Sequence, residues 1–160
     1  MNTTGITRRI GLIGCSASKN PAAVLDQNLL KPAKDMYIGG NFLKSRDEGI
    51  KHFDCEDYYI LSGKYGLLDK DDMIQYYNCY LHDQSSEYKK AWSEKVYNQL
   101  KEKFGDELKN IEFIFFCGQD YSMKLKKRLN CKTLKIVAYR ITFDIKEERV
   151  LVGEKSQVVN

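Results

Sequence analysis

The chain has 160 residues and a formal net charge of +4 at pH 7. This length suits one domain with one hydrophobic core, and 42% hydrophobic with 30% charged residues is typical of a globular protein. No stretch approaches the roughly 20 apolar residues of a membrane span, and residues 1–9 lack the apolar region of a secretory signal. We therefore expect a single cytoplasmic domain over residues 1–160.

The cysteine and histidine content argues against a metal site or a disulfide framework. The chain has five cysteines, an odd number, and no Cys-x-x-Cys pair, so disulfide pairing is not indicated. With only two histidines, no zinc-binding spacing can be assembled. We expect reduced thiols, no metal and no cofactor. The five cysteines are Cys15, Cys55, Cys79, Cys117 and Cys131.

The first half of the chain predicts two buried strands. Residues 8–15 form a short apolar run that ends in small residues, and a loop follows at residues 16–21. Residues 32–53 have a helical composition that Gly39-Gly40 interrupts, so Asn41 is expected to cap a new helix. Residues 57–62 are the second strand, and a turn follows it at residues 63–66.

The second half predicts the longest helix and further strands. Residues 67–82 have no clean period and predict an ordered loop with short turns. Apolar residues recur every four positions within residues 86–104 and predict a helix, which Ser85 or Ser86 caps and Gly105 ends. Strands are expected at residues 111–117 and 133–138, with a basic helix at 121–129 between them and an edge strand at 150–152.

This alternation of strands and helices predicts parallel β-α-β units. We expect an α/β fold with a mostly parallel sheet of four or five strands, covered by helices on both faces. Three strands end in small or polar residues, at Cys15-Ser16, Ser62-Gly63 and Cys117-Gly118. Because ligands bind beyond the carboxyl ends of parallel strands, the three following loops are expected to converge on one cleft.

Two of these loops carry groups that suit a nucleobase or nucleic acid. In residues 14–19 small residues allow close backbone approach and Lys19 can meet a phosphate, although the P-loop spacing is missing. In residues 61–69 two glycines flank Lys64 and Tyr65, and further tyrosines that can stack on bases follow. The alternatives are an ordinary strand-to-helix turn in the first loop and tyrosines that pack at the edge of the core in the second.

The third loop contains a carboxylate. Residues 118–121, Gly-Gln-Asp-Tyr, resemble the water-activating Gly-Gln-Asp-Pro-Tyr loop of uracil-DNA glycosylases without its proline. Alternatively, Asp120 caps the helix behind it. A nucleophilic Cys15 would need a base, and neither His52 nor His82 has a recognisable nucleophile context, so a buried cysteine at the end of a strand is favoured.

Positive charge is concentrated late in the chain. Residues 121–140 contain seven basic residues and no acidic one, a block that can neutralise phosphates. A solvated helix face is the alternative. The residues expected to contact nucleic acid are Lys124, Lys126, Lys127 and Arg128.

Taken in order, these segments resemble the YaaA-like superfamily. The resemblance rests on residues 15–19 (Cys-Ser-Ala-Ser-Lys) after a strand, residues 31–37 (Lys-Pro-Ala-Lys-Asp-Met-Tyr), and residues 61–68 (Leu-Ser-Gly-Lys-Tyr-Gly-Leu-Leu) followed by Tyr76. It covers roughly residues 8–130 and extends to the glycosylase-like domain of archaeal archaeosine-pathway proteins. It implies a three-layer α/β/α sandwich similar to uracil-DNA glycosylases and affinity for DNA or modified nucleobases.

The resemblance implies a hydrolase that acts on an N-glycosidic bond, for which a carboxylate must orient water and donors must meet the departing base. A non-catalytic DNA- or RNA-binding module and an enzyme of modified-nucleotide metabolism are the alternatives. Catalysis is assigned to Asp69, Asp120 and Lys64. Substrate binding is assigned to Cys15, Ser16, Lys19, Tyr37, Ser62, Gly63, Tyr65, Gly66, Tyr76, Gly118 and Tyr121.

Overall fold

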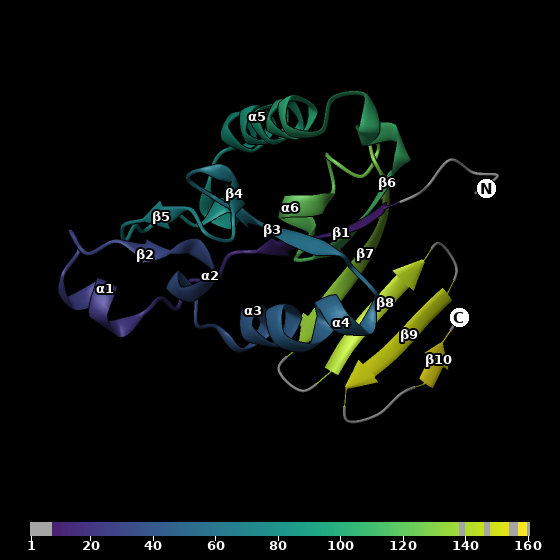
Figure 1. Ribbon diagram of the computed structural model, residues 1–160, viewed down its shortest axis with the longest axis horizontal. Coiled ribbons are helices and arrows are strands. Elements are labelled where there is room, and N and C mark those ends of the chain that lie inside the picture. The colour runs from purple at the N-terminus through teal and green to yellow at the C-terminus, as the bar shows by residue number, and fades with distance from the viewer. Residues whose placement is uncertain (1–7, 138–139, 146–147, 154–156, 160) are drawn as a thin grey trace.

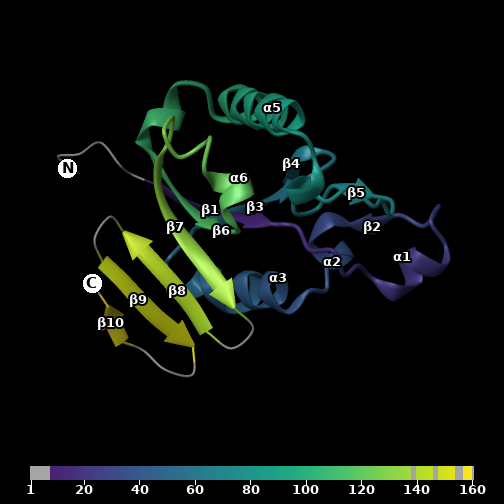
Figure 2. The same ribbon diagram turned by 180° about the vertical axis from the view of Figure 1, so that it is seen from behind.

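The structure is a computed structural model (Figure 1). It describes the backbone of residues 8–137, 140–145, 148–153 and 157–159, and the side chains of residues 8–129. A long twisted sheet runs through the domain, and helices lie on both of its faces (Figures 1 and 2).

The large sheet has the strand order β10-β9-β8-β7-β6-β1-β3-β4. The four central strands β7, β6, β1 and β3 are mutually parallel, and the remaining pairings are antiparallel. The strands of this sheet are β1 (Arg8–Gly14), β3 (Asp57–Ser62), β4 (Gly66–Asp69), β6 (Ile111–Phe116), β7 (Asn130–Val137), β8 (Arg140–Ile145), β9 (Glu148–Gly153) and β10 (Gln157–Val159). A separate pair, β2 (Lys31–Pro32) and β5 (Met73–Ile74), is antiparallel.

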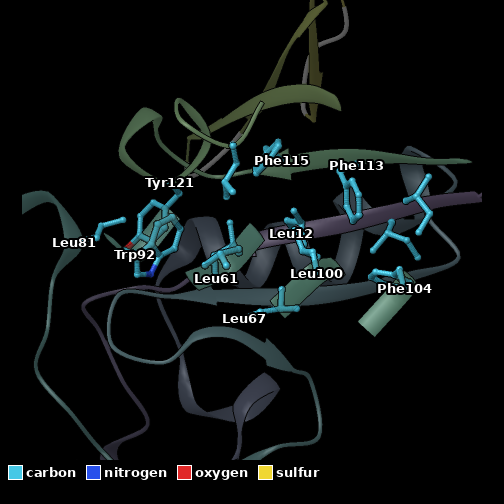
Figure 3. Packing of buried hydrophobic residues seen from close by; sticks show 14 residues of the cluster. Leu12, Leu61, Leu67, Leu81, Trp92, Leu100, Phe104, Phe113, Phe115 and Tyr121 are labelled. Carbon is cyan, nitrogen blue, oxygen red and sulfur yellow. The ribbon is translucent and has the colours of Figure 1, made fainter. Parts of the chain in front are cut away.

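Helices cover the parallel strands from both sides. On one face α5 packs its buried residues Trp92, Val96 and Leu100 against strand residues such as Leu12 and Phe113 (Figure 3). On the other face Ile13 and Ile114 meet Phe42 and Ile50 from the α3–α4 region. The helical segments are α1 (Pro21–Leu25), α2 (Ala33–Met36), α3 (Gly40–Lys44), η1 (Ser45–Gly49), α4 (Ile50–His52), η2 (Leu81–Asp83), α5 (Ser86–Phe104), η3 (Gly105–Asn110) and α6 (Gln119–Ser122).

The α/β class, the parallel central strands and the bounds of the longest helix are confirmed. Ser85 caps α5 by accepting a hydrogen bond from the Tyr88 N–H at 3.1 Å, and Gly105 follows its last residue. The extent of the sheet was underestimated, because antiparallel strands extend it at both edges. The turn Gly63–Tyr65 is too short for a crossover, so β4 must return antiparallel to β3.

Three local predictions were wrong. The segment 67–82 contains β4, β5 and the start of η2 rather than loop alone. Gly39, not Asn41, is the cap of α3. The basic helix expected at residues 121–129 shrinks to α6, after which turns follow. Adjacent like charges at residues 126–128 repel, and no acidic residue within 121–140 offsets them at helical spacing.

Candidate functional site

A cleft of about 490 Å³ opens beyond the carboxyl ends of β1 and β6. This volume lies within the range of roughly 300–1,000 Å³ that small-molecule sites occupy. Its position agrees with the rule that ligands bind beyond the carboxyl ends of parallel strands, since β1 and β6 are central parallel neighbours. The lining residues are Gly14, Cys15, Ser16, Ala17, Ser18, Gly39, Gly40, Asn41, Phe42, Tyr80, His82, Phe116, Cys117, Gly118, Asp120 and Tyr121.

The structure brings two of the three predicted loops into this cleft. Cys15 and Ser16 enter it after β1, and Gly118, Asp120 and Tyr121 enter it after β6. The remaining loop, residues 62–66, lies beside the loop that follows β1, because the Cys15 N–H donates to the Leu61 carbonyl at 2.9 Å. Residues 62–66 nevertheless do not line the cleft.

Within residues 62–66, Ser62 joins a cluster of hydroxyl groups instead. The Ser62 Oγ lies 2.7 Å from the Tyr77 hydroxyl, which lies 2.6 Å from the Tyr37 hydroxyl. All three residues are buried. The Lys64 ammonium is exposed above the Tyr65 ring, 5.1 Å from its centroid. These residues therefore stabilise the part of the domain behind the cleft, and they do not line the cleft itself.

Lys19 also lies behind the cleft and does not line it. It is buried, with 9% of its surface exposed. Its Nζ donates to the carbonyls of Ser16 and Ala17 at 3.3 and 3.4 Å and lies 4.7 Å from the centroid of the Tyr77 ring and 5.7 Å from that of Tyr76. Burial lowers the pKa of Lys19, and the interaction with Cys15 and Cys79 opposes that shift. Lys19 thus holds the 15–18 loop from behind.

Asp69 lies away from the cleft. It sits opposite Tyr59, in the amino-terminal half of β3, because β4 runs antiparallel to β3. Its carboxylate binds the Lys103 Nζ at 2.8 Å, in a hollow formed with the side of α5. Gly66 also lies outside the cleft, at a φ of 77° that favours glycine at the start of β4.

The strongest polar arrangement in the cleft joins Asp120 to His82 and Lys89. Oδ2 lies 2.7 Å from the His82 Nδ1, and Oδ1 lies 3.1 Å from the Lys89 Nζ. The hydrogen bond to His82, followed by the one to Lys89, holds the pKa of Asp120 below its usual value, against the opposing effect of burial. A carboxylate only accepts hydrogen bonds, so His82 Nδ1 carries a proton and Nε2 is left for a ligand. Asp120 is therefore bound by side chains and does not act as the helix cap, which is Gly118.

A thiol forms the other polar feature. The Cys15 Sγ lies 3.2 Å from the Tyr121 hydroxyl. Tyr121 packs edge-on against Trp92 with ring centroids 5.6 Å apart, and the Trp92 Nε1 donates to the Ser62 carbonyl at 2.8 Å (Figure 3). Burial raises the pKa of Tyr121. Cys15 is half-buried at the cleft wall, in contrast to the buried position expected for it.

Sequence reasoning missed several cleft residues. His82, Tyr80, Phe42 and Asn41 all line the cleft, and Lys89 fixes Asp120 from α5. The only available signal for His82 was its place at the end of a tyrosine-rich segment, since 38 positions separate it from Asp120. Its pairing is a tertiary contact that no local pattern reveals.

The basic residues 124–128 follow the cleft residue Tyr121 along the chain. Lys124, Lys126 and Lys127 are exposed. Arg128 forms an ion pair with Glu94, and its guanidinium lies 4.7 Å from the centroid of the Tyr97 ring. Arg128 is thus engaged with α5, which leaves fewer positive charges for phosphates than the sequence indicates.

Among the side chains of residues 8–129, no group of three or more His, Cys, Asp or Glu residues is arranged to hold a metal ion. None of the helices in the described part of the chain is both long and apolar enough to span a membrane.

The sequence matches a family of unknown function, DUF6884, over residues 10–148. The chain belongs to this family. The match includes most of β1, the 14–18 loop, His82, Asp120 and the other central parallel strands, so the whole cleft lies inside the family region. No curated protein and no solved structure matches the chain.

Proposed function

We propose that this protein binds a nucleobase in the cleft and hydrolyses its N-glycosidic bond. The observation that carries the proposal is the Asp120–His82 pair, 2.7 Å apart, at a cleft with aromatic walls. A glycosidic bond to a base breaks when the departing nitrogen receives a proton and water replaces it at the sugar carbon. An imidazole held by a carboxylate can carry out both proton transfers.

The roles of the two residues follow from their hydrogen bond. A carboxylate with a lowered pKa is a poor proton acceptor, so Asp120 orients His82 and supports its positive charge. Nε2 of His82 then donates a proton to the departing base and later takes one from water. This assignment moves the proton-transfer role from Asp120 to His82.

The aromatic side chains that line the cleft suit the binding of a nucleobase. Phe42, Tyr80 and Tyr121 line the cleft, and Tyr80 is 45% exposed beside His82, with ring centroids 5.9 Å apart. Base-to-aromatic stacking contributes about 1–3 kcal/mol per base. A base stacked against Tyr80 would place its glycosidic nitrogen near the His82 ring.

Binding without catalysis is the second candidate function. The exposed Lys124, Lys126 and Lys127 favour it, because cations that follow the cleft along the chain can meet the phosphates of a polymer. The same lysines would hold a polymeric substrate if the cleft is catalytic. An enzyme of modified-nucleotide metabolism would use the cleft alone.

The experiment is a base-release screen. The protein is incubated with DNA that contains modified bases, with RNA, and with nucleosides and nucleoside 5′-monophosphates, and released bases are identified by mass spectrometry. We expect release by the wild type and a loss of about 100- to 10,000-fold in His82→Gln, the usual contribution of a general acid or base. His52→Gln is the matched control, because His52 is exposed on α4 and packs against Phe53. Binding of a substrate without any release would favour the binding module.

A further inference from the structure

Cys15 has the surroundings of a reactive thiol. It follows β1, the strand at the centre of the parallel set, and its backbone is fixed by the 2.9 Å hydrogen bond to Leu61. It is half-buried and lines the cleft, so a ligand can reach its sulfur. Reactive cysteines are partly exposed and lie near positive charge or hydrogen-bond donors.

Tyr121 supplies a hydrogen-bond donor to this sulfur. The hydroxyl lies 3.2 Å from Sγ, and burial keeps the phenol protonated because it raises the pKa of Tyr121. A protonated hydroxyl beside an ionised sulfur donates its hydrogen bond to the sulfur, and a hydrogen bond to the charged form favours that form.

Lys19 supplies positive charge from behind the same loop. Its buried ammonium donates only to the carbonyls of Ser16 and Ala17, and no carboxylate among residues 8–129 forms an ion pair with it. An ionised sulfur on Cys15 or on Cys79 would interact favourably with the Lys19 ammonium. A negative Cys15 sulfur would thus offset part of the charge of a cation whose described contacts include two carbonyls and two tyrosine ring faces.

We propose that Cys15 is the nucleophile of the cleft and forms a covalent bond to the sugar during base release. The inference rests on the proposed function. In the first step the Cys15 thiolate bonds to the sugar carbon, the bond from that carbon to the base nitrogen breaks, and His82 Nε2–H gives its proton to the departing nitrogen. In the second step His82 takes a proton from water, the water oxygen bonds to the carbon, and the thiolate leaves.

The arrangement of the cleft suits these two steps. Cys15 and His82 line the same cavity, and no hydrogen bond joins the Cys15 sulfur to the His82 ring. Both side chains therefore border the volume that a substrate would occupy. A nucleophile and an acid–base group that flank the bond to be broken are the arrangement that retaining glycosidases use. The Tyr121 hydroxyl, 3.2 Å from the Cys15 sulfur, is placed to donate a hydrogen bond to it.

The first test is the alkylation rate of each cysteine in the native protein. The protein is treated with iodoacetamide, and modification is followed by peptide mass spectrometry. Cys117 is the internal control because it lines the same cleft. We expect Cys15 to react about tenfold faster than Cys117 or more, since the thiolate is the reactive form. Cys55 should react slowest, because burial raises its pKa to about 12.

Two variants distinguish activation of the Cys15 thiol by its neighbours from a simple difference in how easily iodoacetamide reaches the sulfur. Tyr121→Phe removes the donor and keeps the ring, and Lys19→Met removes the charge. Both should slow alkylation of Cys15 several-fold, and Lys19→Met should leave Cys117 unchanged, whereas Tyr97→Phe on α5 should change neither rate. Thermal melts identify any variant that is not folded. Equal rates for Cys15 and Cys117 in the wild type would overturn the proposal.

The second test traps the intermediate. Nucleosides and nucleoside 5′-monophosphates are incubated with the wild type, the reaction is quenched in acid, and the intact mass is measured. We expect an added sugar mass on Cys15, and neither adduct nor base release in Cys15→Ala. Base release that survives in Cys15→Ala would overturn the nucleophile and leave the proposed function standing. Fast alkylation of Cys15 without base release from any substrate would instead contradict the proposed function, and with it the glycosyl transfer to Cys15.

Discussion

The hydroxyl of Ser62 lies 2.7 Å from that of Tyr77 and, at the same time, accepts the backbone N–H groups of Lys64 and Tyr65 at 3.2 and 3.0 Å. With both lone pairs of its oxygen engaged, Ser62 donates its own proton to Tyr77, which in turn donates to Tyr37 at 2.6 Å. The Leu-Ser-Gly segment at residues 61–63 therefore closes the turn after β3 and ties it to the core.

This chain of hydroxyls predicts a stability effect. Tyr77→Phe would leave the buried hydroxyls of Ser62 and Tyr37 each without this partner. Each unpaired buried group costs about 1–3 kcal/mol, so the free energy of unfolding should fall by at least that amount. Denaturant unfolding measures the change. Tyr97→Phe, at a half-buried position on α5, is the control and should stay within about 0.5 kcal/mol of the wild type.

The same cluster shows a limit to what residue types predict about function. Serine, lysine and tyrosines after a buried strand were expected to contact a ligand, because their types suit one. The hydroxyls of Ser62, Tyr77 and Tyr37 bind one another instead, and composition alone cannot distinguish the two uses. The strand ends at Cys15 and Cys117 were located correctly, since the apolar run of a central parallel strand is a local signal.

Partners that are distant in the chain could not be predicted. Asp69 was assigned to the site because it follows the turn after β3, but the return of β4 carries it away from the cleft. The local sequence around His82 has no catalytic pattern, and only the fold brings it to Asp120. Antiparallel edges and tertiary ion pairs depend on connections whose direction the hydrophobic pattern does not specify.

A second prediction concerns Gly63. A Cβ added there would lie 2.7 Å from the Cys79 carbonyl oxygen and 3.2 Å from the Leu81 nitrogen, both backbone atoms that cannot move freely. Gly63→Ala should cost about 1–3 kcal/mol of stability, the usual cost of overpacking. It should also displace the segment that leads to His82 and so reduce base release.

The control for that substitution is Gly40→Ala. A Cβ at Gly40 meets nothing within 4 Å, and the residue begins α3. Its stability should be unchanged or raised by about 0.4–1 kcal/mol, because alanine restricts the unfolded chain. Thermal melts of the two variants compare them directly, and equal melting temperatures would contradict the packing argument.

A third prediction concerns the basic segment. If Lys124 and Lys127 each contact a phosphate, their joint replacement by Ala should reduce the slope of log affinity against log salt by about 2. Fluorescence anisotropy with labelled single- and double-stranded DNA at several salt concentrations measures the slope. Lys51→Ala, at an exposed position on α4, is the control. An unchanged slope in the double variant would identify the segment as a solvated surface.

A fourth prediction concerns the pH dependence of stability. The pKa of Asp120 is lowered in the folded protein, first by the hydrogen bond to His82. A carboxyl whose folded pKa is depressed stabilises the fold above its unfolded pKa of about 3.9, and this contribution is lost as the pH falls through the folded value. The stability difference between wild type and Asp120→Asn should therefore shrink below about pH 4. Urea unfolding across pH 2.5–6 measures it, and a difference that stays constant over the whole range would contradict the ion pair.

The last prediction distinguishes the two carboxylates that the sequence proposed. Asp120→Asn removes the charge that orients His82 and supports its protonated form, so it should lower the turnover of base release by about 100-fold or more and largely spare substrate affinity. Asp69→Asn should leave turnover unchanged, because its partner is Lys103 on the side of α5 and not a cleft residue. It should lose at most about 1 kcal/mol of stability, the usual value of an exposed ion pair. Steady-state kinetics of both variants, with thermal melts beside them, measure the two effects. Loss of turnover in Asp69→Asn with full activity in Asp120→Asn would place the chemistry outside this cleft.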